Sequence, residues 1–158
     1  MNLRALWLRA RYARLLLSAR RRVAAGKYEA ARSDVGRIFD LYEARGVEVP
    51  ISADIMRALI AWNLADYGAT AVYVRRAADK LGRRLTTEMC SERRHELHYL
   101  RAYCWTLLYY SEASGAAVRW EHFTDLVPVC HVDLSKVSRT TRETFPVDEE
   151  VFAPAQPQ

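Results

Sequence analysis

The sequence predicts an all-α domain of about six to seven helices that pair as stacked antiparallel hairpins. Helix-forming residues dominate, and only six glycines and five prolines occur in 158 residues. Apolar residues recur at helical spacing between short glycine-containing breaks. Hydrophobic residues make up 51% of the chain, which is enough for one core without disulfides or a metal ion. We expect residues 1–145 to form this single domain and residues 146–158 to be a disordered tail.

The first hairpin is expected to bend at Gly26. Residues 3–24 contain neither glycine nor proline, and the helical pattern resumes over residues 27–45. Gly46 suits the left-handed position that follows a helix end, and Pro50 prevents the helix from continuing.

The second hairpin is expected to begin at Ser52, whose hydroxyl can cap a helix N-terminus. Asp54 then lies where a negative charge favours the positive end of the helix dipole. The break falls within residues 65–71, and the second helix is expected to end at Gly82.

The third hairpin is expected to start with an aromatic-rich helix over about residues 88–112. A break follows at residues 112–120, and a shorter helix reaches about residue 126. Residues 129–145 have two interpretations: "VCHVDLSKV" alternates like a strand, whereas "LSKVSRTTRETF" resembles a short helix.

Each hairpin bends at small residues, which let two helices approach closely. The turn at the first bend resembles the Gly-x-Tyr-x-x-Ala turn of the tetratricopeptide-repeat (TPR) family, and its matching residues are Gly26, Lys27, Tyr28, Glu29 and Ala31. The resemblance covers about residues 12–127. The successive glycines Gly26, Gly68 and Gly115 are 42 and 47 residues apart, against the regular 34 of that family. Either a degenerate TPR-like array or an unrelated helical bundle with similar turns fits this pattern.

The predicted helix over residues 88–112 carries more aromatic surface than one packing partner covers. Tyrosine and tryptophan anchor protein interfaces well, and arginine binds carboxylates in a bidentate manner. The TPR resemblance likewise implies a groove for a peptide or a partner protein. We therefore expect an aromatic-lined partner site formed by Tyr99, Tyr103, Tyr109, Tyr110, Arg94 and Arg101.

Positive charge is concentrated at the start of the chain. Residues 1–28 contain eight basic residues and no acidic one, whereas the rest has 16 basic against 19 acidic residues. One interpretation is a solvated arginine-rich face. A second is binding of RNA or DNA phosphates by this segment. The arginines that share one face of the predicted helix are Arg4, Arg11, Arg14, Arg21 and Arg22.

A third interpretation of the basic segment is an organelle presequence or a membrane-surface helix with Trp7 as its anchor. Arg9 and Arg20 interrupt the apolar arc of the helix and argue against it. The continuity of the segment with the following helix also favours a place within the fold.

No motif predicts catalysis, a cofactor or a metal site. Glycine-rich phosphate loops are absent from the sequence. His95, Glu96 and His98 lack the H-E-x-x-H spacing of a zinc helix, and no C-x-x-C occurs to complete such a site. Two partly exposed helix histidines are therefore the simpler interpretation.

Three cysteines, Cys90, Cys104 and Cys130, do not suit a disulfide framework, so we expect a reducing, cytoplasmic compartment. Cys104 falls on an apolar stripe and is expected in the core. No apolar run is long enough for a membrane span, and residues 1–24 do not match a signal peptide. Together these features predict a non-enzymatic interaction module, such as an adaptor or scaffold subunit, with a small nucleic-acid-binding subunit as the alternative.

Overall fold

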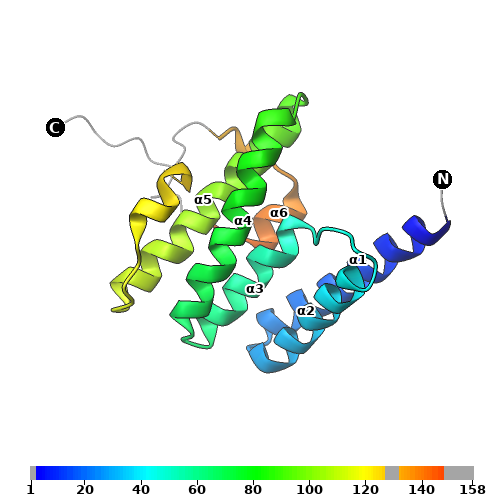
Figure 1. Cartoon of the computed structure of the whole chain (residues 1–158), viewed down its shortest axis with the longest axis horizontal. Coiled ribbons are helices and arrows are strands. Elements are labelled where there is room, and N and C mark those ends of the chain that lie inside the picture. Colours follow the sequence, from blue (N-terminus) through cyan, green and yellow to red (C-terminus); the bar gives the residue numbers. More distant parts are fainter. Residues whose placement is uncertain (1–2, 127–131, 148–158) are drawn as a thin grey trace.

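The computed structural model describes residues 3–126 and 132–147, and this part of the chain contains six α-helices, two 3₁₀ helices and no strand (Figure 1). The all-α prediction is therefore confirmed. The elements are α1 (Leu3–Ala24), α2 (Tyr28–Glu43), α3 (Ile51–Asn63), α4 (Tyr67–Thr87), α5 (Ser91–Ala113), η1 (Trp120–Leu126), η2 (Leu134–Lys136) and α6 (Arg139–Thr144).

Successive helices pack as a series of layers. Helix α1 pairs with α2 and α3 pairs with α4, while α2 also contacts α3 and α4 also contacts α5. Figure 1 shows the α1–α2 hairpin at one end of the molecule, α3 and α4 in the middle, and α5 beyond them. The second arm of the third hairpin is the short 3₁₀ helix η1, which packs against α4 and α5.

The hairpin turns depend on local backbone geometry. Gly26, Gly46 and Gly115 have φ angles of 69°, 60° and 91°, in the left-handed region that glycine adopts without strain. The second hairpin turns instead at Ala65, which has a φ of 57°, and the carboxylate of Asp66 then accepts a hydrogen bond from the backbone N–H of Ala69 at 3.0 Å.

Three expected boundaries differ from the structure. Helix α3 begins at Ile51 directly after Pro50, so Ser52 lies inside the first turn and is not the N-cap. Helix α4 continues through Gly82 to Thr87, because an interior glycine costs only about 1 kcal/mol and the preceding Leu81 is buried. As a result α5 begins at Ser91.

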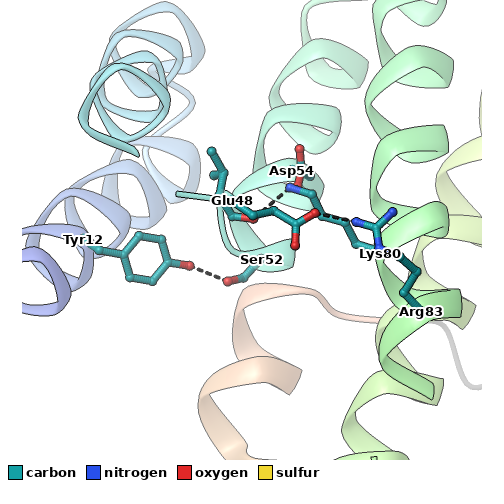
Figure 2. A network of polar contacts seen from close by, with 7 residues as sticks. Tyr12, Glu48, Ser52, Asp54, Lys80 and Arg83 are labelled. Carbon is teal, nitrogen blue, oxygen red and sulfur yellow. Dashed lines mark hydrogen bonds and ion pairs between the residues drawn. The ribbon is translucent and has the colours of Figure 1, made fainter. Parts of the chain in front are cut away.

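A polar network ties α1, α3 and α4 together (Figure 2). The hydroxyls of Tyr12 and Ser52 are hydrogen-bonded, and burial raises the pKa of Tyr12 to about 12. The ammonium of Lys80 pairs with the buried carboxylate of Asp54 and donates to the carbonyl oxygen of Val49 at 2.8 Å.

The core includes residues from both ends of the described chain. Its main cluster extends from Ala19 of α1 to the buried side chains of Val137 and Phe145, and Val147 packs against it. Residues 132–147 therefore belong to the packed structure, with η2 and α6 in place of the strand considered above. Residues 129–131, and residues 148–158 of the predicted tail, lie outside the described residues.

Candidate interaction surface

Tyr99 and Tyr103 lie in the core, which corrects their expected place on an open groove. They are only 3% and 4% exposed. The hydroxyl of Tyr99 donates to the carbonyl oxygen of Phe145 at 2.7 Å, and the ring of Tyr103 lies 5.2 Å from the ring of Phe145. Burial raises the pKa of both phenols. The reason is that residues 132–147, here called the C-terminal segment, cover this face of α5.

Polar contacts also attach the C-terminal segment to the first half of α5. The carboxylate of Glu96 accepts hydrogen bonds from the backbone N–H of Ser138 at 3.2 Å, from its hydroxyl at 2.9 Å, and from the hydroxyl of Thr141. The neighbouring residue His95 accepts a hydrogen bond through its Nδ1 from the backbone N–H of Asp133 at 3.3 Å. The chain itself thus covers the face where a peptide was expected.

The other two predicted tyrosines, Tyr109 and Tyr110, lie together at the exposed C-terminal end of α5. Their ring centroids are 5.6 Å apart, and Tyr109 stacks on a tryptophan 5.1 Å away. The tryptophans that extend this aromatic cluster are Trp62, Trp105 and Trp120. Tyr109 and Tyr110 are 48% and 38% exposed, whereas the three tryptophans are half-buried.

Of the two predicted arginines of α5, Arg94 lies far from this cluster. Arg94 is fifteen residues from Tyr109, which is about 22 Å along a helix axis. Its guanidinium donates to the carbonyl oxygens of Leu85 and Glu88 at 2.9 and 3.2 Å, so it caps the end of α4. Arg101 is half-buried within α5. The structure does not bring the six predicted partner residues together.

The predicted nucleic-acid arginines divide into two groups. Arg22 belongs to the α1–α2 interface, where its Nε lies 3.2 Å from the buried carboxylate of Asp34 and its Nη1 donates to the carbonyl oxygen of Ala30 at 2.8 Å. Ser18 donates to the same carboxylate at 2.6 Å. The other four predicted arginines are exposed on α1, and they are Arg4, Arg11, Arg14 and Arg21.

An apolar hollow of about 700 Å³ lies at the start of α1. Leu3, Leu6 and Trp7 are 82%, 46% and 48% exposed there. The guanidinium carbons of Arg11 and Arg45 lie 5.7 and 4.9 Å from the centroid of the Trp7 ring, within cation–π range. The residues that line the hollow are Leu3, Arg4, Leu6, Trp7, Ala10 and Arg45.

A second, basic hollow of about 490 Å³ shares Trp7 and Ala10 with the apolar hollow. Its single acid is Asp34, whose buried carboxylate is paired with Arg22. The arginines that line it are Arg11, Arg14, Arg22 and Arg37. Apolar and positively charged surfaces therefore adjoin along one side of α1.

The sequence interpretation missed the apolar hollow. Trp7 was considered there only as the anchor of a membrane-surface helix, and Leu6 was not among the predicted site residues. The length of the first helical pattern could have indicated this hollow. Residues 3–24 form a longer helix than α2, so α2 cannot cover all of α1. Figure 1 shows the first turns of α1 extending beyond α2.

The described residues place the remaining candidate groups apart. No set of three or more histidine, cysteine, aspartate or glutamate side chains in this part of the chain is arranged to hold a metal ion. Cys104 is fully buried, as predicted, and burial raises the pKa of its thiol to about 12. Among the described helices, none combines the length and the apolar character that crossing a membrane requires.

Fold and surface define an all-α protein of stacked helical hairpins with an apolar and basic face on its first helix. Comparison of the chain with protein-family models, with curated proteins and with solved structures found no match.

Proposed function

We propose that this protein is a non-enzymatic interaction module, such as an adaptor or scaffold subunit, which binds a partner protein through α1. The observation that carries the proposal is the apolar hollow, where three large apolar side chains are exposed side by side. Contiguous apolar surface on a folded protein is typical of an interaction site. The stacked hairpins, and the resemblance of the first turn to TPR proteins, support the same class of function. A cytoplasmic location remains the expectation from the sparse cysteines.

A protein partner is favoured over nucleic acid because of how the arginines are used. Arg22 neutralises Asp34, and Arg11 and Arg45 lie against the Trp7 ring. The exposed leucines interrupt the arginines along the helix, whereas phosphate recognition requires a polar, positively charged face.

The test is affinity purification of the tagged full chain from its native host, with nuclease treatment, in wild-type and Leu6→Asp forms. We expect a stoichiometric partner protein with the wild type that the variant loses. Val72→Asp is the matched control, since Val72 is an equally exposed apolar residue on α4. Nuclease-sensitive material in place of a protein, or a partner retained by Leu6→Asp, would contradict the proposal.

A further inference from the structure

We infer that the partner element is an acidic amphipathic helix, which lies along the first three turns of α1 with its apolar residues in the apolar hollow and its carboxylates at the basic hollow. This inference rests on the proposed function and adds the chemistry of the partner.

The helical form follows from the unequal lengths of α1 and α2. Helix α1 has 22 residues and α2 has 16, a difference of about 9 Å of helix. Arg45, which follows the end of α2, lines the apolar hollow, so this hollow begins where α2 stops. A partner helix placed there would pack on the turns of α1 that α2 leaves uncovered, with apolar anchors one turn apart, and would lie beside the end of α2 at the basic hollow.

The acidic character follows from charge. Helix α1 contains no acidic residue, and the carboxylate of Asp34 is already neutralised. Arg14 and Arg37 are exposed at the basic hollow, where carboxylates would form charge-assisted hydrogen bonds. A second copy of this chain would instead bring arginine against arginine, which is unfavourable.

The spacing of the two hollows fixes the pattern expected in the partner. Trp7 and Arg14 are seven residues apart on α1, which is about 10 Å along the helix. A helix packed alongside therefore needs acidic residues about two turns from its apolar anchors. The contact from Leu3 to Arg14 spans about 16 Å, or three turns.

The experiment is selection of displayed 16-residue random peptides on the full chain, with counter-selection on Leu6→Asp. We expect enriched peptides to carry large apolar residues at helical spacing and at least two acidic residues about seven positions away. Their affinity, measured by fluorescence anisotropy, should fall at least tenfold with Leu6→Asp and with the double variant Arg14→Glu/Arg37→Glu. Affinity should also weaken with added salt, since exposed charges are screened. Arg75→Glu, an exposed charge reversal on α4, should leave it unchanged.

Three results would overturn the inference. The first is selection of no Leu6-dependent peptide, or of peptides without acidic residues. The second is binding that tolerates Arg14→Glu/Arg37→Glu. The third is self-association of the full chain that Leu6→Asp abolishes, because it would assign the hollow to a second copy. A native partner lost with Leu6→Asp but kept by the arginine double variant would leave the proposed function standing while the acidic partner fails.

Discussion

The hydroxyl of Tyr99 donates a hydrogen bond to the carbonyl oxygen of Phe145 across 46 residues of the chain. This bond, and the packing of Phe145 on Tyr103, join the end of the described chain to the middle of α5. Tyrosines that would otherwise have been open to a partner thereby become part of the core. Of the four predicted tyrosines, only Tyr109 and Tyr110 stay exposed, at the C-terminal end of α5.

Tyr99→Phe should destabilise the protein by about 1–3 kcal/mol, because the buried carbonyl of Phe145 loses this donor. The free energy of unfolding from urea denaturation, followed by circular dichroism, measures the effect. Tyr109→Phe is the control, since that hydroxyl belongs to an exposed residue and its removal should cost less than about 0.5 kcal/mol. Equal losses from the two variants would mean that the Tyr99–Phe145 bond does not hold the C-terminal segment.

Glu96→Ala should loosen the C-terminal segment without unfolding the rest of the domain. The carboxylate of Glu96 accepts three hydrogen bonds from Ser138 and Thr141, at the start of α6. Their loss from a partly exposed site should raise amide hydrogen exchange over residues 138–145 by about tenfold, the equivalent of about 1.4 kcal/mol. Exchange in α3 should not change. Glu43→Ala, an exposed substitution on α2, is the control, and an equal rise in both variants would argue against this role.

The turns were predictable because their causes are local. Gly26, Gly46 and Gly115 require only a positive φ, and that preference is encoded in the residue itself. The boundaries predicted from Ser52 and Gly82 were wrong for the opposite reason. Pro50 starts α3 earlier, and packing carries α4 through its glycine, so context overrides an intrinsic preference.

The candidate surface was predicted only in part. Tyrosines such as Tyr99 and Tyr103 are typical of protein interfaces, but here Phe145, more than thirty residues away in the sequence, packs on them. The sequence of the segment that contains Phe145 had two interpretations. The exposure of Leu6 and Trp7 depends on where α2 ends relative to α1. Such relationships arise from tertiary packing and are not readable from one helix at a time.

Lys80→Met should destabilise the protein by about 3–5 kcal/mol at pH 7, because it leaves the carboxylate of Asp54 buried without its cation. Urea denaturation measures the loss, and the double variant Asp54→Leu/Lys80→Met should recover much of it. Burial raises the pKa of Asp54 despite the ion pair. A carboxyl with a raised folded-state pKa favours folding below its unfolded pKa and loses that advantage as the pH rises.

The penalty of Lys80→Met should therefore shrink as the pH is lowered from 7, because Asp54 takes up a proton in the folded state more readily than in the unfolded chain. A penalty that is independent of pH, or a double variant no more stable than Lys80→Met alone, would show that the pair does not couple in this way.

The stability of the protein should also depend on His98 near neutral pH. Nδ1 of His98 is buried without a hydrogen-bond partner among the described residues, and burial together with Arg101 and Arg94 lowers its pKa. Below the unfolded pKa of about 6.5, the unfolded chain binds a proton that the folded chain does not. The free energy of unfolding should therefore rise from pH 5.5 to pH 7.5, by less than about 1.4 kcal/mol per pH unit, the limit for one proton.

His98→Gln should flatten this rise, which urea denaturation at four pH values would measure. His95→Gln is the matched control one turn earlier on α5, and it should keep most of the slope. The decisive comparison is between the two variants, because every other titrating group contributes equally to both. A slope that survives His98→Gln unchanged would contradict this assignment.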